Sequence, residues 1–192
     1  MGREIRMVPP NWDHPQRDPE YDTYRHGGLQ PMHDENYADA KRKWIDGLMQ
    51  WEAGTYPGQA TFASCEWWDY SGDPPVAAYY RPWKDNEATW FQVWETVSEG
   101  TPVTPPFATK EELVDYLVTK GDFWQESAIK KGWERARPGY PGYSREAAEA
   151  FVLGDGYAPT MVVIQKPEGA EIHEGINVPL ALNKDDTISQ PC

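Results

Sequence analysis

The densest group of polar side chains in the sequence lies in residues 94–107, WETVSEGTPVTPPF. This segment holds two carboxylates, four hydroxyl groups and a glycine, and three prolines restrict its backbone. A stiff loop loses less conformational entropy on binding, so it presents side chains to a partner at low cost. We predict a binding surface formed by Trp94, Glu95, Thr96, Ser98, Glu99, Gly100 and Thr101, together with the nearby Trp83. In the alternative interpretation, the loop only connects a strand to the next helix.

Two carboxylates lie beside tryptophans and could take part in acid–base chemistry. Glu66 precedes Trp67 and Trp68, and Glu95 follows Trp94. Apolar neighbours raise the pKa of a carboxyl group, and aromatic faces stack on sugars and bases. Glu95 and Glu66 are therefore the candidates for a catalytic pair in a sugar- or nucleotide-binding cleft. The alternative is that the tryptophans fill a core and the acids face solvent, so the sequence establishes no catalytic residue.

Other chemistries lack their usual motifs. The four histidines are His14, His26, His33 and His173, and none stands in a metal-binding frame. The chain has neither a nucleophile elbow nor a glycine-rich phosphate loop. Cys65 lies in an apolar segment, where a small buried side chain is expected. We therefore predict no metal and no cofactor.

The composition excludes some classes of partner. The chain has 192 residues and a net charge of −13, with 18 basic and 31 acidic side chains. A nucleic-acid backbone or an anionic membrane attracts basic surfaces, so neither is an expected partner. No apolar run approaches the roughly 18 residues that a membrane-spanning helix needs. The ten tryptophans indicate a folded chain, because disordered sequences are poor in aromatic residues.

The pattern of apolar residues predicts an α+β fold. The expected helices cover residues 36–52, 109–121, 123–131 and 144–154, and the expected strands cover 61–70, 76–83, 89–97 and 161–165. This order suggests a small antiparallel sheet rich in tryptophan, with three or four helices packed on it. Five of the ten tryptophans lie between residues 59 and 98, so we place the aromatic centre in this sheet.

One domain is expected over residues 1–167. Five prolines in residues 1–35 predict an irregular arm, which carries aromatic side chains and so should pack on the domain. Residues 168–192 are polar and are expected to form a loosely held tail.

Several stretches of the sequence resemble a widespread family of uncharacterised bacteriophage and prophage proteins. They include the opening MGREIRMVPPNWDHP, the segment WETVSEGTP at 94–102 and the segment FATKEELVDYL at 107–117. The resemblance covers nearly the whole chain to about residue 165, and it implies a viral origin. Two cysteines do not make a disulfide framework, so the host cytoplasm is the expected location, with packaging in the virion as an alternative.

From these observations we expect a non-enzymatic protein that binds a host or phage macromolecule. Small acidic phage proteins often block host proteins, including restriction and CRISPR machinery, and the resemblance implies such a host-takeover or anti-defence role. Two alternatives remain: a sugar- or nucleotide-binding protein or enzyme with an aromatic cleft, and a minor structural protein of the virion. The sequence does not determine the oligomeric state.

Overall fold

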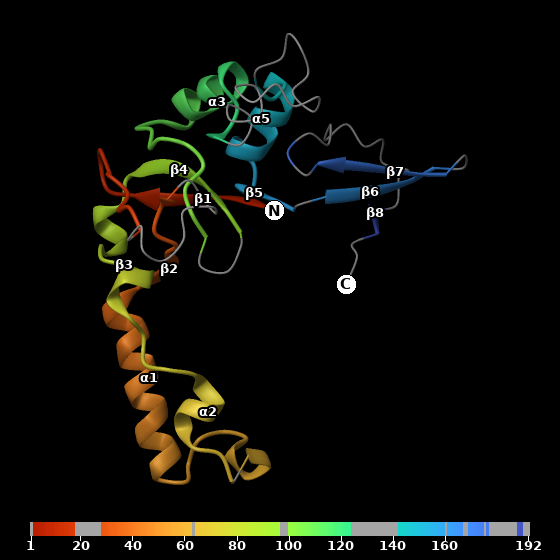
Figure 1. Cartoon of the computed structure of the whole chain (residues 1–192). Coiled ribbons are helices and arrows are strands. Elements are labelled where there is room, and N and C mark those ends of the chain that lie inside the picture. Colours follow the sequence, from red (N-terminus) through yellow and green to blue (C-terminus); the bar gives the residue numbers. More distant parts are fainter. Residues whose placement is uncertain are drawn as a thin grey trace.

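The protein has an α+β fold built around a small antiparallel sheet (Figure 1). The computed structural model describes residues 2–17, 28–62, 64–96, 100–123, 142–159, 161–166, 169–174, 176 and 188–189. Within them, an arm of two helices projects from one side of the sheet, and a β-hairpin extends at another (Figure 1).

The sheet is formed by β1 (Arg3–Val8), β4 (Trp90–Glu95) and β5 (Tyr157–Ala158), in the order β4-β1-β5. β1 is central and pairs antiparallel with both neighbours. The outer edge of β4 is covered by residues 101–107, since Phe91 and Phe107 exchange both of their backbone hydrogen bonds. The polar groups of β4 are thus paired along both edges, which allows the strand to be buried.

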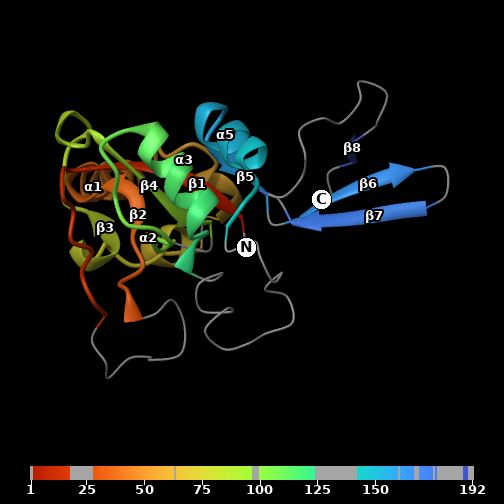
Figure 2. The same cartoon turned by 90° about the horizontal axis from the view of Figure 1, so that it is seen from above.

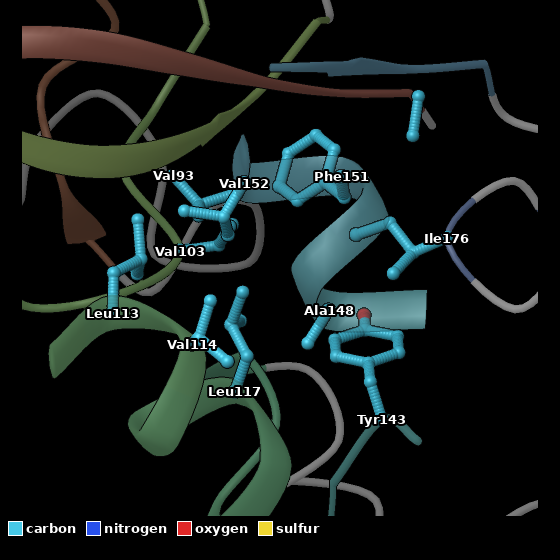
Figure 3. Close-up of a cluster of buried hydrophobic side chains, with 11 residues drawn as sticks. Val93, Val103, Leu113, Val114, Leu117, Tyr143, Ala148, Phe151, Val152 and Ile176 are labelled. Atoms are coloured by element: carbon cyan, nitrogen blue, oxygen red, sulfur yellow. The ribbon is translucent and has the colours of Figure 1, made fainter. Parts of the chain in front are cut away.

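One face of the sheet packs against two helices, α3 (Lys110–Thr119) and α5 (Arg145–Leu153). Figure 3 shows the cluster between them, in which β4 contributes Val93 and the two helices contribute most of the remaining apolar side chains. Its buried members are Val93, Val103, Leu113, Val114, Leu117, Tyr143, Ala148, Phe151, Val152, Ala158 and Ile176.

Local signals in the sequence fix the starts of these two helices. The Thr109 hydroxyl accepts a hydrogen bond from the Glu112 backbone N–H at 3.1 Å, and the Glu112 carboxylate accepts one from the Thr109 backbone N–H in return. The Ser144 hydroxyl caps α5 in the same way, accepting from the Ala147 backbone N–H. These caps satisfy backbone donors that would otherwise lack partners, so the predicted helix starts are confirmed.

The other face of the sheet is covered by irregular segments rather than by helices. Val8, Met32, Trp83, Ala88 and Trp94 form a second buried cluster there. Beside it, β2 (His33–Asn36) and β3 (Tyr80–Arg81) make a short parallel pair. β4 is therefore covered on both faces, and both of its sides carry apolar or aromatic side chains.

The projecting arm consists of α1 (Tyr37–Glu52), the 3-10 turn η2 (Gln59–Phe62) and α2 (Trp67–Ser71). The Asn36 side chain caps α1 by accepting from the Ala38 backbone N–H. Trp67 is buried against α1, and a Cβ placed on Gly47 would lie only 2.4 Å from its ring. The absence of a side chain at Gly47 therefore lets the two helices approach.

The hairpin is formed by β6 (Met161–Lys166) and β7 (Gly169–Glu174), and β8 (Ile188–Ser189) pairs with the other edge of β6. Seen from above, it extends away from the helices that cover the sheet (Figure 2). Beyond β7 the chain returns to the main core, where Ile176 is buried.

Two predicted strands are wrong in type or length. Residues 61–70 contain the end of η2 and most of α2, because Trp67 and its neighbours pack on α1 instead of pairing with a strand. Of residues 76–83, only Tyr80–Arg81 form a strand. The tryptophans of 59–98 are consequently divided between the arm and the sheet.

Both chain ends also differ from the prediction. β1 lies in the segment expected to be irregular, since the alternation of Arg3–Val8 suits a strand with two covered faces. β7 and Ile176 lie in the segment expected to be a loose tail. The helix predicted at 123–131 falls almost entirely outside the described residues, whereas the expected elements at 36–52, 89–97 and 161–165 are confirmed.

We predict that Gly47→Ala destabilises the arm, although alanine favours helices more than glycine does. The new methyl group would force the Trp67 ring to move, and overpacking of this kind costs about 1–3 kcal/mol. Urea unfolding followed by tryptophan fluorescence measures the change. Gln50→Ala, at an exposed position of the same helix, is the control and should be nearly neutral. Equal stability of the two variants would contradict the packing described here.

Candidate functional site

The structure places most of the predicted binding surface inside the molecule. Trp94 is 1% exposed, Glu95 0% and Thr101 2%, and Gly100 is buried beside them. Thr96 is half-buried, and its backbone N–H donates to the Gly2 carbonyl. Ser98 and Glu99 lie outside the described residues. Trp94, Glu95 and Thr101 are therefore interior residues in this structure, and their contact with a partner stays a prediction.

Trp94 is held between two polar side chains on the face of the sheet opposite the helices. The guanidinium carbon of Arg6 lies 4.5 Å from the centroid of its ring, in a cation–π contact. The imidazole of His14 meets the ring edge-on, with centroids 5.0 Å apart. The indole N–H donates to the Gln92 side chain at 3.2 Å. The aromatic ring and the N–H group of this indole thus both contact other side chains of the protein.

His14 is itself fixed by two hydrogen bonds. Its Nδ1 accepts from the Trp12 indole N–H at 3.2 Å, and its Nε2 lies 2.6 Å from the Gln30 carbonyl oxygen. These partners require a neutral ring with the proton on Nε2. Burial lowers the pKa of His14 and the nearby Arg6 lowers it further, against the opposing effect of the Gln30 carbonyl. The neutral imidazole is therefore the form that stabilises the fold.

Glu95 has an interior partner in the turn that follows it. The Thr101 hydroxyl donates to its carboxylate at 2.7 Å, and the Glu95 backbone N–H donates to the Thr101 carbonyl at 3.0 Å. Gly100 makes this turn possible, because its φ is +83° and a Cβ there would lie 2.6 Å from the Glu95 carbonyl oxygen. Glu95 and Thr101, two of the polar residues that suggested a binding loop, are thus bound to each other.

Trp83 was expected to be exposed, and it is 5% exposed. Its ring contacts that of Trp12 at a centroid distance of 4.4 Å, and its carbonyl accepts from the Asn36 side chain at 2.8 Å. Among the described residues its indole N–H has no hydrogen-bond partner. Trp83 therefore belongs to the core cluster that also contains Trp94.

The two candidate carboxylates of a catalytic pair lie on different parts of the molecule. Glu95 is in β4, whereas Glu66 precedes α2 in the projecting arm (Figure 1). The Glu66 backbone N–H donates to the Asp69 carboxylate, so this residue helps to start a helix. Glu95 and Glu66 therefore do not form a pair in this structure, and Trp94 beside Glu95 is buried.

The described part of the chain contains no cluster of three metal-binding side chains. None of its helices is long and apolar enough to cross a membrane. Two hollows on α1 are open to solvent. One is lined by Tyr37, Ala38, Lys41, Arg42, Ile45 and Asp46, and the other by charged residues around the start of the helix.

The exposed apolar side chains gather mainly on the arm. The large hydrophobic residues exposed in the described chain are Met7, Ile45, Met49, Phe62, Trp68, Tyr70, Val76, Phe123, Leu153 and Tyr157. Six of these ten lie between residues 45 and 76, in or next to the arm. We call Phe62, Trp68 and Tyr70, which lie on η2 and α2, the arm aromatic surface. The sequence did not indicate this surface, because the pattern of residues 61–70 predicts a strand.

The arm aromatic surface is supported from beneath by stacked rings. Tyr70 stacks on Trp51 of α1 with centroids 4.9 Å apart, and Phe62 contacts Tyr70 at 5.2 Å. Trp68, by contrast, is 53% exposed. An aromatic surface with a rigid base suits binding, because its side chains lose little freedom when a partner covers them.

Comparisons with known proteins give no family for the chain: no family model matches it, and neither does any curated protein or solved structure.

We predict that the stability of the protein falls as the pH drops below about 6.5, the ordinary pKa of an unfolded histidine. The folded-state pKa of His14 is lower, so the unfolded chain takes up a proton first and acid favours unfolding. Urea unfolding at several pH values between 5 and 7.5 measures the slope. In His14→Gln the slope should be smaller, because this substitution removes the titrating group. An unchanged slope would contradict the role given to His14.

We also predict that Glu95→Ala lowers the free energy of unfolding, by about 1–3 kcal/mol, because it removes the buried carboxylate that accepts the hydrogen bond of the Thr101 hydroxyl. Thr101→Val and the double variant complete a mutant cycle. Non-additive losses indicate the direct interaction seen here. Full stability of Glu95→Ala would restore Glu95 as a candidate binding residue.

Proposed function

We propose that this protein is a non-enzymatic binding protein that recognises another protein through the arm aromatic surface. The observation that carries the proposal is the concentration of exposed large apolar side chains on a projecting element. Scattered single exposed residues are normal on soluble proteins, whereas a group of them commonly marks an interaction surface.

The residue types at this surface also favour a protein partner. Tryptophan and tyrosine are enriched among the residues that contribute most to protein–protein binding, and leucine and valine are not. Trp68 combines a large exposed ring with a short helix that holds its backbone in place. Phe62 and Tyr70 contact each other, with ring centroids 5.2 Å apart, and add two further exposed aromatic side chains to the arm.

The alternative of a small-ligand protein or enzyme receives no support from the described residues. Trp83 and Trp94 are buried, and their rings contact other side chains of the protein. Glu95 and Glu66 lie apart, so no carboxylate pair faces an aromatic cleft. A ligand pocket is usually concave and partly enclosed, whereas the hollows on α1 are open.

A bacteriophage origin gives the proposal a biological setting. The partner is then a host or phage protein, and blocking a host function, such as restriction or CRISPR-type defence, is the use that we propose. Binding to a virion protein is the alternative, in which case the protein would be a minor component of the particle. Identifying the partner distinguishes these uses.

Site-specific crosslinking in the host cell tests the proposal. We expect a photoreactive phenylalanine analogue at position 62 or 68 to give one discrete adduct, identifiable by mass spectrometry. The same analogue at Tyr157 is the control, because Tyr157 is an equally exposed aromatic residue on β5, away from the arm. Absence of an adduct at 62 and 68, or the same adducts at all three positions, would overturn the proposal.

Once the partner is identified, affinity measurements give the magnitude. Trp68→Ala should weaken binding by about tenfold or more, as expected for an aromatic residue that dominates an interface. Tyr157→Ala should leave the affinity unchanged. Circular dichroism of both variants verifies that the helices remain folded.

A further inference from the structure

A second exposed apolar surface lies on α1, on the side turned away from α2. The helix contacts α2 through Trp44, Gly47 and Trp51. Ile45 and Met49 point elsewhere, and they are 40% and 63% exposed. In Figure 1, α2 accompanies α1 on one side only. We call Lys41, Ile45, Met49 and Glu52 the outer face of α1.

These four residues form one stripe along the helix. They are separated by four, four and three positions, so in an α-helix they lie within roughly 80° of one another. Lys41 stands at one end of the stripe and Glu52 at the other, with the two apolar side chains between them. The outer face thus has a positive end, an apolar centre and a negative end.

The two charged ends lack ion-pair partners in the described part of the chain, unlike their neighbours. Arg42 pairs with Asp39, and Lys43 pairs with Glu35. Lys41 lies over the ring of Tyr37 with its Nζ 5.9 Å from the centroid, and neither it nor Glu52 forms an ion pair among the described residues. Both charges are therefore available to an incoming helix.

The outer face of α1 is complementary to the outer face of a second α1 helix that runs in the opposite direction. If a second copy of α1 lies antiparallel to the first, Ile45 faces Met49 of the second copy. In the same alignment Lys41 faces Glu52 of the second copy, and the two-fold symmetry repeats both contacts. A parallel alignment would instead place Lys41 against Lys41 and Glu52 against Glu52. The geometry points to a two-fold dimer in which the outer faces of two α1 helices pack antiparallel.

The charge distribution supports a second copy as the occupant. The chain carries a net charge of −13, which opposes self-association through most of its surface. The segment Tyr37–Glu52 carries three basic and three acidic side chains, so its net charge is zero. An unrelated partner would need the same reversed order of charges, which the second copy already has. The arm projects from the part of the molecule that holds the sheet (Figure 1), so antiparallel pairing of two arms would place the two sheets towards opposite ends of the interface.

This dimer involves a different face of the arm from the one in the proposed function. The arm aromatic surface lies on η2 and α2, and the outer face lies on α1. The dimer does not depend on the proposed function, and variants of Trp68 and of Lys41 separate the two.

Charge exchange between the ends of the stripe tests the dimer. Sedimentation velocity over about 1–200 μM should show the wild-type chain forming dimers as its concentration rises. Lys41→Glu alone and Glu52→Lys alone should each weaken dimerisation by about tenfold or more, because each creates two like-charge contacts. An equimolar mixture of these two variants should form a mixed dimer, and the double variant should dimerise like the wild type.

The controls separate the interface from folding. Ile45→Ser should also weaken the dimer, whereas Leu153→Ser, at an exposed apolar position of α5, should not. Circular dichroism establishes that each variant keeps its helices. A wild-type chain that stays monomeric throughout this range would overturn the proposal. Single variants that dimerise normally, or a mixture that does not recover dimerisation, would overturn it as well.

Discussion

Arg6 lies on the central strand beneath the ring of Trp94, and its guanidinium joins segments that are far apart in the sequence. Its Nε donates to the Glu4 carboxylate at 2.6 Å, and its Nη1 donates to the Met32 carbonyl at 2.5 Å. Met32 in turn donates from its backbone N–H to the Gly100 carbonyl. A buried guanidinium is costly unless its donors are satisfied, so these segments must stay in place around it. The face of the sheet that lacks helices is organised by this requirement.

The sequence predicted the elements whose signals are local. The caps at Thr109 and Ser144, and the spacing of apolar residues in 36–52, depend only on nearby positions, and the corresponding helices are present. The segment around Trp67 was assigned to a strand, because a short aromatic run suits either structure. Its conformation is decided by contact with α1 at Gly47, twenty residues earlier, and no local pattern contains that information.

The burial of Trp94, Glu95 and Thr101 in the predicted binding loop was not foreseen for a related reason. Polar side chains and prolines usually indicate a surface, and residues 94–107 contain both. Glu95 and Thr101 are nevertheless buried, because each supplies the hydrogen-bonding partner that the other needs. A sequence shows that two polar groups exist, but it does not show that they meet. The exposed aromatic residues of α2 were not predicted. The sequence placed the tryptophans of the arm and those of the sheet in one predicted sheet, because the pattern of residues did not distinguish them.

The burial of Ile176 in the main core has a consequence for the synthesis of the protein. β1 leaves the ribosome before its partners β4 and β5, which lie about 85 and 155 residues later in the chain. Ile176 follows later still. β1 therefore has neither of these partners until β4 has been synthesised. The arm, by contrast, packs within a short stretch of sequence and can form early. Long-range pairing of this kind slows folding, so the arm is expected to become structured before the sheet that carries it.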